Sequence, residues 1–126
     1  MNKPDTIMID DVRYIREDKA SNPASKLDGL ERVIIRSYAA GVFIGYLAEK
    51  KAEVSGVNVT LKQARRIYYW DGACSLTQLA MEGSKSPLNC KITEAINEQW
   101  VGDVIEILPV SQESADIIDG VSAWKK

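Results

Sequence analysis

The sequence predicts an α+β domain in which antiparallel strands come first and two helices accompany them. Apolar residues alternate over short stretches rich in β-branched side chains, which is typical of strands. These stretches follow one another through short loops instead of alternating with helices, and this order favours an antiparallel sheet. The 126 residues, 45% of them hydrophobic, are enough for one domain with a core.

The amino-terminal part is predicted to be an extension of the main domain. Residues 6–16 read as two short strands around Asp10-Asp11, and residues 19–29 form a polar, turn-rich linker. A two-stranded hairpin is marginally stable alone. We therefore divide the chain into an extension, 1–29, and a body, 30–126, and expect the hairpin to contact the body or a neighbouring subunit.

Six stretches of the body have the composition of strands. The predicted strands are residues 32–38, 42–49, 57–61, 65–70, 91–97 and 104–108, with a charged hairpin loop at 49–56 and Pro109 after the last. Asp71-Gly72 is predicted to form the turn that follows the fourth strand.

Two helices are predicted from their capping residues. Ser75 and Ser111 occupy N-cap positions, and Gly83 ends the first helix. The apolar positions of these helices are Leu76, Leu79 and Ala80 in the first and Ala115, Ile118 and Val121 in the second. Two helices cover at most one face of a sheet, while apolar and aromatic residues occur on both strand faces. We therefore expect the second face to contact another chain, which predicts an oligomer.

Composition excludes several classes of protein. A net charge of -2 argues against a DNA-coating protein or a polybasic membrane anchor. No apolar run approaches the roughly 20 residues of a spanning helix, and no signal-peptide pattern begins the chain. Cys74 and Cys90 have no metal-ligand spacing, so we expect reduced thiols in a soluble intracellular protein.

Catalytic and cofactor patterns are missing as well. Histidine is absent, which removes serine and cysteine triads and ordinary zinc sites. The glycines fit neither a dinucleotide-binding nor a P-loop pattern. We predict a protein without a metal or cofactor, and consider an enzyme less favoured than a binding protein.

The strongest candidate for a binding site is the stretch 65–70. Arg65 and Arg66 can pair with phosphate oxygens, and Tyr69 and Trp70 offer rings for stacking on a nucleobase. Alternation along a strand places Arg66, Tyr68 and Trp70 on one face and Arg65, Ile67 and Tyr69 on the other. The two arginines are therefore expected to serve different faces.

Arg36, Tyr38 and Asn89 complete the set of candidate ligand-binding residues. Each candidate has an ordinary structural alternative. The arginines serve equally well in salt bridges or subunit contacts, and packing is the commoner role of strand aromatics. For Asn89 the favoured interpretation is a loop residue beside Pro87. From the residues alone, the prediction ends at a soluble oligomeric α+β domain that binds a small anion.

A resemblance extends this prediction. The strings VIIRSYAAGVFIGYL, VTLKQARRIYYWDGACSLTQLAMEG, PLNCKIT and VIEILPVS…WKK span residues 31–126 and resemble the first type of phage Thoeris anti-defence protein. Such proteins bind the cyclic ADP-ribose isomers made by TIR-domain defence enzymes and hold them without cleaving them. Some form hexamers, as trimers of dimers, with separate sites for cyclic trinucleotides.

The resemblance implies a non-enzymatic sponge in the host cell cytoplasm that self-associates as a dimer or hexamer. It also implies which ligand the candidate binding residues would contact, a cyclic ADP-ribose isomer. Arginines would contact the diphosphate, and aromatic residues and Asn89 would contact the base or ribose. Two alternatives stay open, a phage structural or interaction domain without a nucleotide ligand and an enzyme that degrades the signal.

Overall fold

The structure is a computed structural model that describes residues 22–126. The predicted hairpin at residues 6–16 lies outside this range. Within the described range, no helix is long and apolar enough to cross a membrane.

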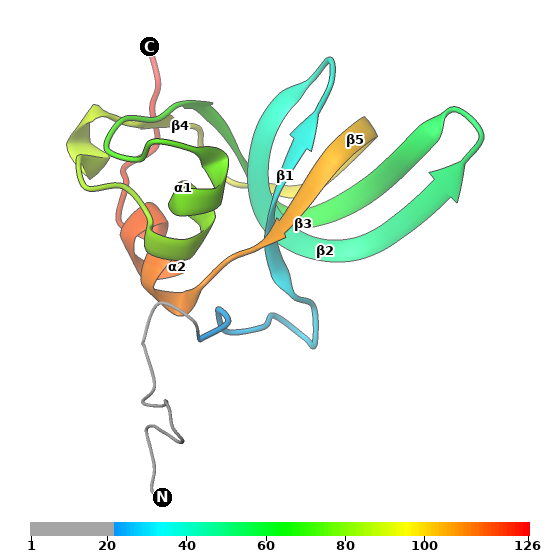
Figure 1. Cartoon of the computed structure of the whole chain (residues 1–126), viewed down its shortest axis with the longest axis horizontal. Helices are drawn as coiled ribbons and strands as arrows, with labels where there is room; N and C mark the ends of the chain where they lie inside the picture. Colours follow the sequence, from blue (N-terminus) through cyan, green and yellow to red (C-terminus); the bar gives the residue numbers. More distant parts are fainter. Residues whose placement is uncertain (1–21) are drawn as a thin grey trace, which may run out of the picture.

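The body is an antiparallel five-stranded sheet with two short α-helices, as Figure 1 shows, and the α+β prediction is confirmed. The elements are, in order, β1 (Arg32–Ser37), β2 (Gly41–Glu53), β3 (Gly56–Tyr69), α1 (Leu76–Glu82), the 3-10 helix η2 (Pro87–Asn89), β4 (Lys91–Ile92), β5 (Ile96–Pro109) and α2 (Gln112–Asp119).

Both helices begin at their predicted caps. The hydroxyl of Ser75 accepts a hydrogen bond from the backbone N–H of Gln78 at 3.1 Å. The hydroxyl of Ser111 accepts one from Ser114 at 3.0 Å. Each bond pairs an amide that the first helical turn leaves without a backbone partner.

The strands are longer and fewer than predicted. Residues 57–61 and 65–70 are predicted to be separate strands, but 57–61 and 65–69 lie in the single strand β3, which continues through Gln63 at a φ of 49° and ends before Trp70. The register with β2 shifts there, so a bulge replaces the expected break. The predicted strand 91–97 is also wrong, because β4 ends at Ile92 and Ile96 already belongs to β5.

The sheet closes on itself. Its order is β2-β1-β5-β3-β4, and β2 also pairs with β3. The strands β2, β1, β5 and β3 therefore form a small closed barrel. Figure 1 shows the β2–β3 hairpin curving away from the two helices. The side chains inside, which we call the barrel core, are Val33, Ile35, Phe43, Val59, Leu61, Ala64, Val101 and Val104.

A second core lies between the outer sheet face and the helices. This helix-side core contains Ile34, Val42, Ile44, Ile67, Leu79, Ala80, Cys90, Ile92, Val110, Ala115 and Ile118, with Ala24 added from the amino-terminal side. Barrel closure buries one strand face, and the helices cover part of the other, while Trp100 and Ile105 of β5 stay exposed. Only the uncovered part of the outer face remains available for contact with another chain, and oligomerisation stays a prediction.

The described end of the predicted linker packs on the body. The N–H of Ala24 donates to the carbonyl oxygen of Val110 at 2.9 Å, and Asn22 accepts from the N–H of Gln112 at 2.8 Å. Ala24 is buried in the helix-side core.

Candidate functional site

Arg65 and Arg66 point to opposite faces of β3, as alternation predicted. Arg65 pairs across the sheet with Ile44 of the helix-side core, and Arg66 pairs with Phe43 of the barrel core. Directly opposed residues of an antiparallel pair project to the same face. The two guanidinium groups therefore belong to different surroundings.

Arg65 is a structural residue, which corrects its assignment as a phosphate ligand. Its buried guanidinium group donates to the backbone oxygens of Thr93 at 2.7 Å, Ile118 at 3.0 Å, Val121 at 2.8 Å and Ile92 at 3.4 Å. Burial lowers the pKa of Arg65 from its ordinary value, against the attraction of Asp119. These bonds join β3 to β4, to α2 and to the segments that follow them, so the donors do not face an external ligand.

Arg66 is exposed and remains a candidate for contacting phosphate. Its guanidinium carbon lies 4.7 Å from the centroid of the Phe43 ring, a cation–π contact at the edge of the barrel core. Beside it is a hollow of about 410 Å³, lined also by Thr93, Glu94 and Ile96. An exposed cation beside a hollow is suited to contacting an anionic ligand.

Aromatic rings and a lysine gather at the end of β3, the strand that also carries Arg66. Tyr68 stacks on Trp124, with ring centroids 5.1 Å apart and planes 13° apart. The ammonium group of Lys91 lies 5.4 Å from the centroid of Trp124 and 6.0 Å from that of Tyr69. We call Arg66, Tyr68, Tyr69, Lys91 and Trp124 the aromatic–basic surface.

Short pairings hold this surface together. Tyr69 pairs with Lys91 between β3 and β4, and Ala123 forms a parallel bridge with Ile92. The N–H of Trp124 donates to the Ile92 carbonyl at 2.9 Å, which fixes the carboxyl-terminal segment beside β4. The surface thus draws on three segments that are distant in sequence.

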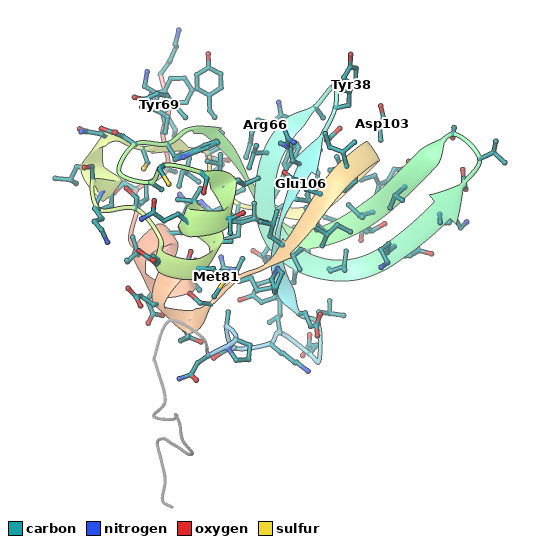
Figure 2. All side chains as sticks on the ribbon, viewed as in Figure 1. Tyr38, Arg66, Tyr69, Met81, Asp103 and Glu106 are labelled. Carbon is teal, nitrogen blue, oxygen red and sulfur yellow. The ribbon has the colours of Figure 1, made fainter. Side chains whose placement is uncertain are left out.

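Arg36 and Tyr38 lie at a different place, on β1 and the turn after it. The Nε of Arg36 donates to Glu106 at 2.8 Å, and both side chains are about half exposed. This is the salt bridge that the ordinary interpretation expected. Tyr38 is 80% exposed beside Asp103, whose carbonyl accepts the Tyr38 N–H at 3.0 Å. Figure 2 shows Tyr38, Arg66 and Tyr69 spread along one side of the molecule.

Trp70 and Asn89 have structural contacts. β3 ends at Tyr69, so alternation does not extend to Trp70, which is half-buried against the helix-side core. Asn89 ends η2, and its amide donates to the carboxylate of Asp71 at 3.2 Å. Of the seven candidates, Tyr69 lies in the group of rings around Lys91, and Arg66 is exposed three residues earlier on the same strand.

Sequence reasoning missed Lys91 and Trp124. Neither residue is among the candidates predicted from the sequence, and Lys91 enters only as the first residue of the predicted strand 91–97. Their meeting depends on the parallel bridge between Ala123 and Ile92, which no local pattern predicts. The Trp-Lys-Lys ending was the one available signal, since it places a ring among cations.

The aromatic–basic surface presents rings and cations of the kind that contact ligands. Among residues 22–126, no three His, Cys, Asp or Glu side chains are grouped to hold a metal ion. The aromatic–basic surface offers stacking faces and fixed positive charges, which recognise flat anionic molecules.

Comparison with known proteins identifies the family to which the chain belongs. Residues 30–118 match the family described as a domain of unknown function, DUF6948. The chain belongs to this family. The DUF6948 match includes Arg66, Tyr68, Tyr69 and Lys91, while Trp124 lies beyond it. No curated protein and no solved structure matches the chain.

Proposed function

We propose that this protein binds an anionic nucleotide at the aromatic–basic surface and retains it chemically unchanged. The observation that carries the proposal is the position of Lys91, whose ammonium group lies near the rings of both Tyr69 and Trp124. A purine can stack where rings are exposed, and its phosphates can reach the neighbouring cations. Arg66 supplies a second positive charge from the adjacent strand.

Magnitudes favour this combination of groups. Stacking of a base on an aromatic side chain contributes about 1–3 kcal/mol. Charge-assisted hydrogen bonds to phosphate are roughly twice as strong as neutral ones. Because the whole chain has a net charge of -2, attraction for an anion must come from this local arrangement.

The resemblance to the Thoeris anti-defence proteins supports a narrower version of the proposal. In this version the ligand is a cyclic ADP-ribose isomer, and cyclic oligonucleotides are a further class. The protein acts in the host cell cytoplasm by lowering the concentration of free signal. Sequestration requires neither a base nor a nucleophile, which agrees with a sequence that contains no histidine.

The competing function is an interaction domain without a nucleotide ligand. It is favoured by exposed apolar side chains that are not part of the aromatic–basic surface, including Leu88 at 99% and Val54 at 109% relative exposure. In that case Lys91 and the rings would contact a protein partner.

A heat-release assay separates these functions. The protein is incubated with a cyclic ADP-ribose isomer, freed of unbound ligand by gel filtration, and denatured at high temperature. We expect intact nucleotide in the supernatant only after denaturation. A changed nucleotide would indicate an enzyme instead, and no retained nucleotide would leave the interaction domain as the better account.

A further inference from the structure

A hollow that shares no lining residue with the aromatic–basic surface lies over the strands of the long hairpin and β5. Its volume is about 810 Å³, and its lining includes Glu49, Asn58, Thr60, Lys62 and Trp100. The paired residues Glu49–Thr60 and Thr60–Trp100 place three side chains in one row across β2, β3 and β5. The row lies on the face opposite the barrel core.

The exposure of Trp100 is the feature of this groove that packing within the chain does not explain. Its side chain is 77% exposed, although an indole ring gains much from burial. One edge of the ring is hydrogen-bonded, because its Nε1–H donates to one oxygen of Glu98 at 2.9 Å. Lys62 occupies the other Glu98 oxygen at 2.5 Å. The indole N–H is therefore paired within the protein, while the face of the ring is open to a ligand.

The charges around the ring limit the ligand. Two acidic residues, Glu49 and Glu98, and two lysines, Lys51 and Lys62, line the groove and balance one another. Such a lining gives no net attraction for a polyanion. Thr60 and Asn58 add a hydroxyl and an amide, which both donate and accept hydrogen bonds.

From this geometry we propose that the groove binds a neutral saccharide. The apolar C–H face of a pyranose ring packs on the Trp100 indole, and its hydroxyls bond to Thr60, Asn58 and the charged groups at the rim. The ring platform supplies apolar contact, and the polar groups orient the ligand, which is the usual division of roles in a small-molecule site. The proposal is independent of nucleotide binding at the other surface.

The test is a titration followed by NMR of amide and indole N–H groups. The probes are maltotriose, cellotriose and N,N′,N″-triacetylchitotriose, with trigalacturonate as a charged comparison. We expect at least one neutral trisaccharide to shift the Trp100 indole signal saturably, with a Kd of about 1 mM or below. Trigalacturonate is expected to bind at least about tenfold more weakly, a difference of 1.4 kcal/mol.

Two variants locate the effect. Trp100→Ala is expected to weaken binding by about tenfold or more, and Thr60→Val by a smaller factor, while Trp124→Ala leaves it unchanged. Absence of a saturable shift with all three neutral probes would overturn the proposal. Sedimentation supplies a second check, because a change of oligomeric state in Trp100→Ala would identify the groove as a subunit contact instead.

Discussion

Arg65 illustrates how burial decides the role of a side chain. In the sequence it is indistinguishable from Arg66, and both are reasonable phosphate ligands. In the structure, Arg65 donates to four backbone oxygens, whereas Arg66 is exposed over an aromatic ring. Alternation predicts that the two side chains point to opposite faces of the strand. It does not predict which side chain is buried, because that depends on where α2 and the segment after it pack.

Replacement of Arg65 should therefore destabilise the protein. Arg65→Ala removes donors from four carbonyl groups and leaves a cavity, so we expect a loss of about 2–4 kcal/mol in urea unfolding. Arg65→Lys should recover only part of this, since an ammonium group lacks the planar fork of guanidinium. The matched control is Arg66→Ala, expected to cost about 1 kcal/mol or less. Equal losses for Arg65→Ala and Arg66→Ala would contradict the structural role.

Glu98 gives a prediction of pH dependence. Hydrogen bonds from Lys62 first, and then from Trp100, lower the pKa of Glu98. A lowered pKa means that the folded state favours the carboxylate. The contribution of Glu98 to stability is therefore present at neutral pH and is lost as the pH falls through its folded pKa.

The Trp100 indole N–H resonance should report this titration, with a midpoint below the ordinary value for glutamate. Lys62→Met should move the midpoint upward, because it removes the largest cause of the shift. An identical midpoint in wild type and variant would refute the assigned cause. Lys85→Met serves as the control, since Lys85 interacts with Glu82 elsewhere.

At the scale of elements, the sequence predicted helices better than strands. Capping serines mark the helix starts by local chemistry, so Ser75 and Ser111 could be placed from the sequence. Strand continuity depends on bulges. Gln63 and Asp103 adopt positive φ values of 49° and 55° within β3 and β5, and polar residues at such places resemble turns. Hydrogen bonding to the neighbouring strands keeps the chain in the sheet on both sides of Gln63 and of Asp103, so neither residue ends its strand.

The turn between β3 and α1 yields a prediction at this scale. Gly72 has a φ of +81°, and a Cβ there would lie 2.5 Å from the backbone nitrogen of Ser86. Gly41 has a similar φ of +98°, but a Cβ there would meet nothing within 4 Å. Gly41→Ala should thus cost only the backbone strain of about 1–2 kcal/mol. Gly72→Ala should cost at least about 2 kcal/mol more, because backbone must move. Thermal unfolding measures both, and equal losses would refute the close approach.

At the scale of the whole molecule, the α+β class followed from the sequence and the closure of the sheet did not. Closure requires β2 to pair with both β1 and β3, and its consequence is that Phe43 and Ile35 lie inside a barrel. The sequence shows apolar residues on both strand faces but not what covers each face. The inference of an oligomer depended on that missing information.

One ion pair joins the barrel to the helical side. Buried Arg32 on β1 donates to both carboxylate oxygens of Asp119 at the end of α2, at 2.8 and 2.6 Å. Asp119→Ala would leave a buried cation without its partner, so we expect a loss of about 3 kcal/mol in chemical denaturation. Asp116→Ala, on the exposed side of the same helix, should cost less than about 1 kcal/mol. Similar values for the two variants would contradict the linking role of Arg32.

The central claim is that the aromatic–basic surface binds an anionic nucleotide, and calorimetric titration tests it most directly. A cyclic ADP-ribose isomer is titrated into the wild-type protein, Trp124→Ala, Lys91→Gln and the matched control Trp100→Ala. We expect saturable binding to the wild type and to Trp100→Ala, and affinity reduced by about tenfold or more in the other two, a loss of about 1.4 kcal/mol each. Wild-type affinity in Trp124→Ala and Lys91→Gln, or no binding to the wild-type protein, would contradict the claim.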